Sequence, residues 1–232
     1  MPNESAGAPP RDLPPELNPD FERFREALGQ AAAGAGSGLD PVRDPTALRL
    51  WREYGRLLYQ RAAGLALIGK GDRAHVYTRH VLDSLNALTA LPAPPRSALD
   101  IGSGAGLPGI PLAIAWPASQ VVLLESRERK AGFLEQAVRA LGLRNVRVVC
   151  ARLEDYGRSW TSGPFDAVFI RALGDLAVTL ANASKAATED AGWVYFLGSR
   201  SREEALDGES ASAEVMKGAF GGRLLTGKFP RP

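Results

Sequence analysis

The chain has 232 residues, a formal net charge of +2, 45% hydrophobic residues, one cysteine and two histidines. This length suits one substantial core, and no apolar run approaches the roughly 20 residues needed to cross a membrane. A single cysteine excludes an internal disulfide, and so few cysteine and histidine ligands argue against a metal site. No basic segment followed by an apolar one opens the chain, so we expect a cytoplasmic protein.

Proline, alanine and glycine dominate the first forty residues. Prolines stud residues 2–15, and an alanine- and glycine-rich stretch at residues 31–38 follows a short helical piece at about residues 21–28. This composition predicts a disordered or loosely ordered N-terminal extension over residues 1–40.

Two helices are predicted next. Apolar residues recur at helical spacing over residues 45–64, and a second helix is expected over residues 74–91, before the proline-rich stretch 92–95. We expect these helices to form a helical cap over residues 41–95, packed beside the following domain.

Residues 96–232 are predicted to form an α/β domain with a parallel sheet. Apolar runs lead into Asp100 and occupy residues 121–125, 146–150 and 165–171, with a helical pattern over residues 129–141. Strands that alternate with helices in this rhythm indicate a Rossmann-like sheet. Cys150 falls on one of these strands and is predicted to be a small core residue. A late strand is expected at residues 193–198, a polar helical or loose segment over residues 203–219, and a last strand at residues 221–229.

The most informative motif is Asp100-Ile-Gly-Ser-Gly-Ala-Gly-Leu-Pro-Gly109, which follows the first of these strands. Glycines allow a sharp turn and let a ligand approach the backbone closely. A dinucleotide fingerprint would need a third glycine where Leu107 stands, so a nicotinamide oxidoreductase is disfavoured. The pattern Gly102-x-Gly104-x-Gly106 after an acid instead suggests the S-adenosylmethionine loop of class I methyltransferases. Asp100 is expected to order this loop rather than to perform chemistry.

Two charged residues end predicted strands. Glu125 closes the second strand, where an acid in doubly wound folds accepts hydrogen bonds from ribose hydroxyls. Arg171 closes the fourth strand, at the edge where open sheets bind their ligands. Both are therefore candidate site residues.

The glycine motif with its Leu-Pro-Gly-Ile-Pro extension, together with Arg79-His-Val-Leu-Asp-Ser-Leu85, resembles the RsmG (GidB) family. The resemblance runs from about residue 50 to about residue 198. It implies a class I S-adenosyl-L-methionine-dependent fold and methyl transfer to N7 of a specific guanine in 16S ribosomal RNA. The implied partner is that RNA or the small ribosomal subunit, with a monomeric enzyme sufficing.

The resemblance also implies roles for individual residues. Gly102 and Leu107 would line the methionine and ribose side of the cofactor, and Leu153 and Glu154 would flank its adenine. Arg171 would close the site near the methyl donor, while Arg79 and His80 would face the target nucleotide or the RNA backbone. The cofactor-binding candidates are thus Asp100, Gly102, Gly104, Gly106, Leu107, Glu125, Leu153, Glu154 and Arg171, and the catalytic candidates are Arg79, His80 and Arg171. The family usually carries Asn-Leu-Thr where this chain has Ala66-Leu67-Ile68.

Two other functions remain open from the sequence. One is a class I methyltransferase with a different acceptor, and the other is an RNA-binding relative without catalytic activity. Cations outnumber anions over residues 52–83 and 127–158. Such patches suit RNA phosphates, but they are equally typical of solvated helix surfaces.

Overall fold

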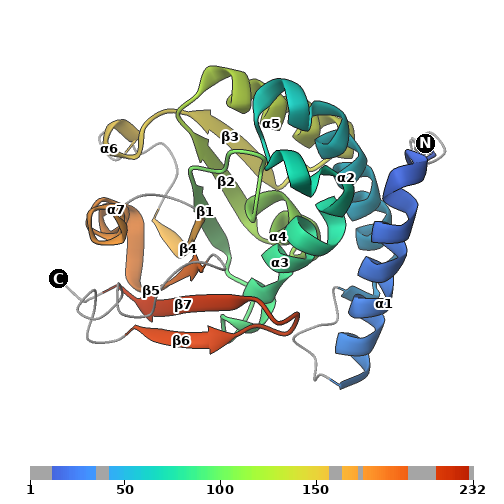
Figure 1. Cartoon of the computed structure of the whole chain (residues 1–232). Coiled ribbons are helices and arrows are strands. Elements are labelled where there is room, and N and C mark those ends of the chain that lie inside the picture. The colour runs from blue at the N-terminus through green and yellow to red at the C-terminus, as the bar shows by residue number, and fades with distance from the viewer. Residues whose placement is uncertain (1–11, 35–41, 157–163, 172–174, 198–212, 230–232) are drawn as a thin grey trace, which may run out of the picture.

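The computed structural model describes residues 12–34, 42–156, 164–171, 175–197 and 213–229. Its centre is a seven-stranded sheet with the order β3-β2-β1-β4-β5-β7-β6 (Figure 1). The strands are β1 (Ser97–Ile101), β2 (Gln120–Glu125), β3 (Val146–Cys150), β4 (Phe165–Arg171), β5 (Ala187–Phe196), β6 (Glu214–Lys217) and β7 (Arg223–Lys228). The first five are parallel, and β7 pairs antiparallel with both β5 and β6. The predicted α/β class is confirmed.

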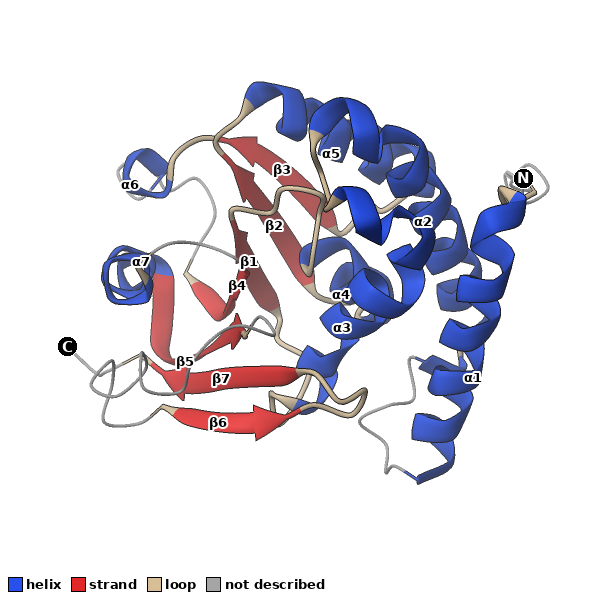
Figure 2. Ribbon diagram, in the orientation of Figure 1, coloured by secondary structure: helices blue, strands red, loops and turns tan. Residues whose placement is uncertain are grey.

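Successive side chains of the central strands point to opposite faces of the sheet, as the period of a β-strand requires. In β2, Leu123 packs into one hydrophobic cluster and Leu124 into the other; in β4, Phe169 and Ile170 divide in the same way. Helices α2 (Pro45–Leu65), α4 (Gly109–Ala115) and α5 (Glu128–Leu141) cover the first face, and α6 (Leu153–Tyr156) and α7 (Leu176–Ala183) the second (Figure 2). The carboxyl ends of the parallel strands lie between these two layers of helices.

The N-terminal region differs from the expected loose extension. Residues 18–34 form α1 (Asn18–Gly34), preceded by a 3₁₀ turn at Pro15–Leu17, whereas residues 1–11 and 35–41 lie outside the described part. Phe24 is fully buried, and its ring lies 6.0 Å from that of Trp51 and 5.8 Å from that of Tyr77. These aromatic contacts therefore fix α1 against the cap. The proline- and alanine-rich sequence on either side of the helix did not indicate them.

The helical cap also differs from its prediction in one part. Helix α2 begins after Asp44, whose Oδ1 accepts a 2.8 Å hydrogen bond from the Thr46 amide. Instead of a single helix over residues 74–91, the chain forms 3₁₀ helix Lys70–His75, π-helical turn Tyr77–Val81, short helix α3 (Leu82–Ser84) and 3₁₀ helix Leu85–Thr89. Asp20 of α1 explains the break, because its Oδ2 accepts the Tyr77 amide at 2.7 Å. This bond gives the Tyr77 amide a partner on another helix at the point where the π-helical turn begins.

Two predictions near the sheet edges are wrong. Residues 214–217 form strand β6, not a polar helical or loose segment, because pairing with β7 satisfies their backbone groups. Cys150 is exposed, because its strand β3 is the edge of the sheet and is not covered there. Residues 198–212, which hold most of the predicted polar segment, lie outside the described part.

Among the described helices, none combines the length and the apolar character that crossing a bilayer requires.

Candidate active site

A glycine-rich turn joins the end of β1 to the start of α4. Gly102, Gly104 and Gly106 have positive φ angles of 68°, 57° and 92°, a conformation that glycine adopts without steric cost. A Cβ on Gly106 would also lie 2.5 Å from Cδ1 of Ile110, so packing excludes a side chain there. The turn therefore presents bare backbone at the carboxyl edge of the sheet.

Asp100 lies beneath this turn and is fully buried. Its Oδ2 accepts a 3.0 Å hydrogen bond from the Gly109 amide at the start of α4, while Oδ1 has no hydrogen-bond partner among the described residues. Burial raises the pKa of Asp100 to about 7, because the charged carboxylate is poorly solvated there. This geometry suits the ordering role expected for Asp100, which does not line the adjoining cavity.

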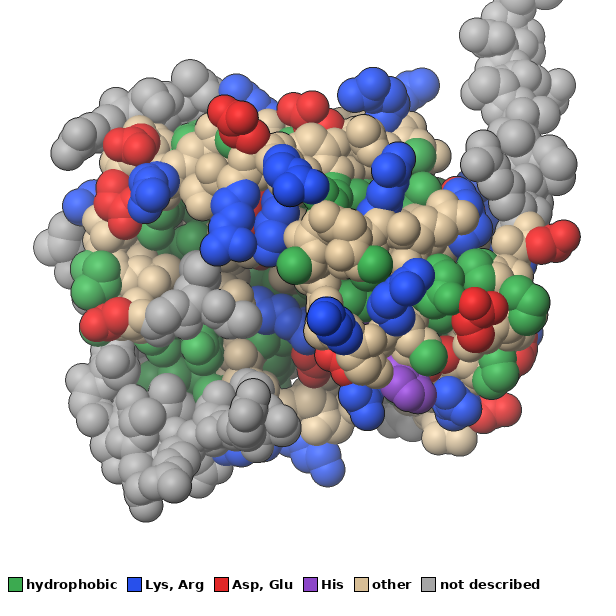
Figure 3. Space-filling model, turned by 45° about the horizontal axis from the view of Figure 1, so that its top comes forward, with side chains coloured by type: hydrophobic (Ala, Val, Ile, Leu, Met, Phe, Trp, Pro, Cys, Tyr) green, Lys and Arg blue, Asp and Glu red, His purple; other side chains and the backbone are tan. Residues whose placement is uncertain are grey.

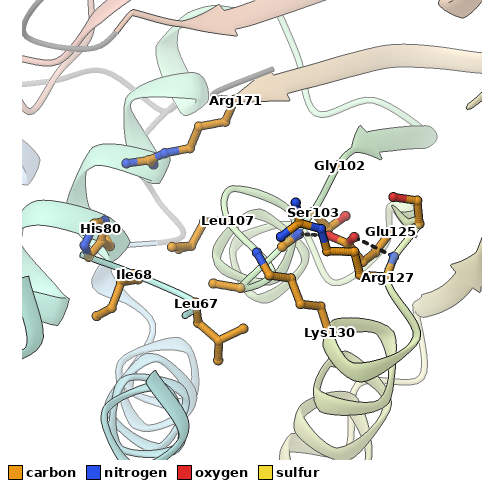
Figure 4. A pocket seen from close by; sticks show the side chains of 13 residues that line it. Leu67, Ile68, His80, Gly102, Ser103, Leu107, Glu125, Arg127, Lys130 and Arg171 are labelled. Carbon is orange, nitrogen blue, oxygen red and sulfur yellow. Dashed lines mark hydrogen bonds between the residues drawn. The ribbon is translucent and has the colours of Figure 1, made fainter. Parts of the chain in front are cut away.

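A cavity of about 420 Å³ opens beside the glycine-rich turn (Figure 4). It brings together residues from the cap, the turn and the ends of β2 and β4. Its walls include the predicted site residues His80, Gly102, Gly104, Leu107, Glu125 and Arg171. Residues not predicted for the site also line it, namely Leu67, Ile68, Ser103, Ala105, Ser126, Arg127 and Lys130. Gly106 supports the turn without lining the cavity.

Glu125 ends β2 and is 6% exposed. Its Oε2 accepts a 2.9 Å hydrogen bond from the Gly104 amide, and its Oε1 accepts one of 2.8 Å from the Arg127 amide. These two bonds lock the carboxylate against the glycine-rich turn. Each carboxylate oxygen has a further lone pair, so Glu125 can also accept hydrogen bonds from hydroxyls in the cavity.

Arg171 ends β4 and reaches across the cavity toward the cap segment that carries His80 (Figure 4). Its Nη2 lies 2.9 Å from Oδ2 of Asp83, and its Nη1 donates to Oγ of Ser84 at 3.4 Å. The guanidinium carbon lies 5.6 Å from the centre of the Phe196 ring. The cap and the sheet thus hold one cation at the ligand-binding edge.

His80 lies on the π-helical turn, and its side chain is 13% exposed. Its Nε2 is 3.5 Å from Oδ2 of Asp72, but neither ring nitrogen has a hydrogen-bond partner among the described residues. Burial, together with a smaller contribution from the nearby Arg171 charge, lowers the pKa of His80 to about 4. At neutral pH the ring is therefore uncharged, with one nitrogen able to donate and the other to accept.

Arg79 stands apart from the other predicted catalytic residues. Its side chain is 59% exposed, its Nη1 lies 2.6 Å from Oδ1 of Asp72, and it does not line the cavity. The structure therefore brings His80 and Arg171 to the cavity but leaves Arg79 on the surface beside it.

A second cavity, of about 190 Å³, adjoins the first. Leu153 and Glu154 line it, together with Val178 and Thr179 of α7. Gly102 and Ser126 line both cavities, so an elongated ligand that spans the carboxyl ends of β1 and β2 could occupy the two. The predicted cofactor residues other than Asp100 and Gly106 thus line one or both of two neighbouring cavities.

Cations gather around the mouth of the first cavity (Figure 3). Exposed Arg127 and half-buried Lys130, at the start of α5, line the cavity, and Arg129 between them in the sequence is exposed. The basic first turn after the Glu125 strand was visible in the sequence, but its position at the cavity depends on how α5 turns back onto the sheet. No group of three or more histidine, cysteine, aspartate or glutamate side chains that could hold a metal occurs in the described ranges.

Comparisons with known proteins agree with this arrangement. Residues 48–219 match the family model for rRNA small subunit methyltransferase G (GidB). The chain is 36% identical over 179 residues to ribosomal RNA small subunit methyltransferase G of Pelotomaculum thermopropionicum, covering 76% of this chain and 73% of that protein. It is 37% identical over 174 residues to the protein of the same name from Nitrosococcus oceani, covering 75% and 78%.

Among solved structures, cofactor-bound Rv0187 from MTB aligns with a TM-score of 0.52 at 21% identity, covering 93% of this chain and 98% of that chain, which supports the fold. The sequence matches identify the family as well as the fold. The chain belongs to the rRNA small subunit methyltransferase G (GidB) family.

Proposed function

We propose that this protein transfers a methyl group from S-adenosyl-L-methionine to N7 of a specific guanine in 16S ribosomal RNA. The observation that carries the proposal is the cavity at the carboxyl edge of the sheet, where Gly102, Glu125 and Arg171 meet in a chain of this family. The proposal includes a cytoplasmic, monomeric enzyme that acts on the RNA or on the small ribosomal subunit.

The cavity residues fit the cofactor. The carboxylate of Glu125 can accept hydrogen bonds from ribose hydroxyls beside the glycine-rich turn. Leu153 and Glu154 line the adjoining cavity, which would take the adenine, while Gly102 and Leu107 would lie along the ribose and methionine. The bound cofactor supplies an electrophilic methyl group on a sulfonium.

The reaction requires little acid–base chemistry from the protein. The N7 lone pair forms a bond to the methyl carbon as the carbon–sulfur bond breaks, and the positive charge passes from sulfur to the base. No proton moves, so the uncharged His80 is consistent with this chemistry. The contribution of the protein is to hold N7 and the methyl group at close distance and in line.

Arg171 and His80 are the residues that would meet the target nucleotide, because both line the cavity on its cap side. Arg127 and Lys130, which line the cavity, and the exposed Arg129 between them in the sequence would contact RNA phosphates. Exposed Arg79 would add a phosphate contact outside the cavity. An extruded or looped guanine suits such a recessed site better than a paired one.

The test is transfer of labelled methyl from S-adenosyl-L-methionine to small ribosomal subunits from a strain that lacks this gene. We expect label on a single guanine at N7, and loss of most of it with Arg171→Ala. Label on a protein or small molecule would overturn the choice of acceptor. Cofactor binding without any transfer to subunits or to naked RNA would overturn the proposed activity.

A further inference from the structure

Asn86 is fully buried between the cap and the C-terminal hairpin. Its Oδ1 accepts hydrogen bonds from the amides of Phe220 at 2.8 Å and Gly222 at 3.2 Å, in the turn that joins β6 to β7. Its Nδ2 donates to the backbone oxygen of Asp83 at 2.9 Å and to the Asp83 carboxylate Oδ1 at 3.3 Å. One amide group thus connects the hairpin turn with Asp83.

The carboxylate of Asp83 has a different partner on each oxygen. Oδ1 accepts from Asn86, and Oδ2 lies 2.9 Å from Nη2 of Arg171 in the cavity. Burial raises the pKa of Asp83, whereas the contacts with Arg171 and Asn86 favour its charged form. Asn86 and Arg171 together therefore fix the orientation of this carboxylate.

The hairpin turn is built to approach Asn86 closely. A Cβ on Gly222 would lie 2.6 Å from Oδ1 of Asp83, and one on Gly218 would collide with the side chain of Asn86. The Gly218 amide also donates to the Gly222 oxygen at 2.8 Å, which closes the turn. Glycine at both positions leaves space for the amide of Asn86 against the backbone.

We propose that Asn86 is a positioning residue for the candidate active site: clamped by the β6–β7 turn, it aims the carboxylate of Asp83 at Arg171 and so sets the direction of the Arg171 guanidinium in the cavity. The contacts run without a gap from Gly222 through Asn86 and Asp83 to Arg171. The consequence for methyl transfer rests on the proposed function, but the positioning itself does not.

Two variants test whether Asn86 orients Asp83 and Arg171 or only attaches the β6–β7 turn to the cap. Asn86→Asp keeps an oxygen that can accept the Phe220 and Gly222 amides, but it loses the donor to Asp83 and adds a negative charge beside it. Asn86→Ala loses both contacts. Thr89→Ala is the matched control, because it removes a 3.0 Å hydrogen bond from the same 3₁₀ helix, to the Asn86 backbone oxygen, without touching Asp83 or Arg171.

The first measurement is the NMR signal of the Arg171 Nε–H group in the ligand-free protein, assigned by its loss in Arg171→Lys. We expect a distinct, slowly exchanging signal in the wild type and in Thr89→Ala, and a shifted, faster-exchanging one in Asn86→Asp. An unchanged signal in a folded Asn86→Asp protein would overturn the proposal and leave Asn86 as a hairpin fastener. This outcome does not depend on whether the protein methylates RNA.

The second measurement is transfer kinetics. If Asn86 acts through Arg171, Asn86→Asp lowers kcat about tenfold or more, as a small misplacement of a positioned group does. The double variant Asn86→Asp/Arg171→Lys is then no slower than Arg171→Lys alone, whereas multiplicative losses would contradict action through Arg171. A wild type inactive on RNA would count against the proposed function, and the NMR comparison would still decide the positioning.

Discussion

The hydroxyl of Tyr54 on α2 donates a 2.8 Å hydrogen bond to the backbone oxygen of Ala105 in the glycine-rich turn. Both groups are buried, and three residues earlier the Trp51 indole donates to the Pro111 oxygen of α4 at 3.1 Å. Helix α2 of the cap therefore holds the glycine-rich turn through these two hydrogen bonds, while Asp100 and Glu125 hold it from strands β1 and β2 of the sheet.

Tyr54→Phe should loosen this turn. Removing the hydroxyl leaves the buried Ala105 oxygen without that partner, which costs about 1–3 kcal/mol of unfolding free energy. Because Ala105 lines the cavity, cofactor affinity should fall as well. Urea unfolding and titration with S-adenosyl-L-methionine measure the two effects.

Tyr59→Phe is the control for this change. Tyr59 lies on the same helix, but its hydroxyl bonds the exposed Glu16 at 2.6 Å, so its loss should cost less than about 0.5 kcal/mol. Equal losses of stability in the two variants would show that the Tyr54–Ala105 bond has no special role.

Asp100 should make the protein less stable as pH rises from about 4 to 7. Its pKa is about 7 in the folded protein against 3.8 for an unperturbed carboxyl, so over this range the folded state retains a proton that the unfolded state has lost. The shift corresponds to roughly 4 kcal/mol, fully lost above pH 7. Asp100→Asn, which keeps an acceptor for the Gly109 amide, should remove this slope in urea unfolding measured from pH 4.5 to 8. A slope that persists in Asp100→Asn would contradict the assignment of this pH dependence to Asp100.

His80 should have the opposite effect from Asp100: it should make the protein less stable as pH falls below about 6.5. Its pKa is about 4 in the folded protein against 6.5 unperturbed, so stability is complete above pH 6.5 and is lost as pH falls toward 4. The full loss is roughly 3 kcal/mol. His80→Gln should abolish it, which unfolding across pH 4 to 7 would reveal. A slope that remains in His80→Gln would contradict this assignment to His80.

Ala66 carries backbone strain at the end of α2. Its φ is 48°, in the left-handed region, which costs an L-residue roughly 1–2 kcal/mol. Glycine and asparagine are the usual residues at such a helix end, and asparagine stands here in the family pattern. Ala66→Gly should therefore raise the unfolding free energy by about 1 kcal/mol in urea.

The matched change Ala63→Gly, at an exposed position in the last turn of the same helix, should lower the unfolding free energy by up to about 1 kcal/mol. If both changes destabilise the protein, the left-handed conformation of Ala66 is not the source of strain.

The parallel sheet could be predicted because its central strands β1, β2 and β4 are buried on both faces and separated by helices, which leaves continuous apolar runs in the sequence. The position of Glu125 and Arg171 at the cavity could be predicted for a related reason: both follow from where β2 and β4 end. Helix α1 was underestimated, because its stability comes from the contacts of Phe24 with Trp51 and Tyr77, not from local composition.

The remaining residues depend on contacts that no local pattern reveals. Tyr54 and Ala105 are 51 positions apart, and Asn86 and Gly222 are 136 positions apart. The break at Tyr77 likewise depends on Asp20, 57 positions earlier. Exposure of Cys150 follows from the strand order, which places β3 at the edge.

The clamp between Asn86 and the β6–β7 turn also has a consequence for the order of events during synthesis. Asn86 leaves the ribosome long before its partners Phe220 and Gly222, which follow 134 and 136 residues later. Contacts of such separation form late, because a long loop must close first. The glycine-rich turn and the ends of β1, β2 and β4 can assemble on the nascent chain, whereas Asn86 gains its clamp only after the residues up to Gly222 have left the ribosome.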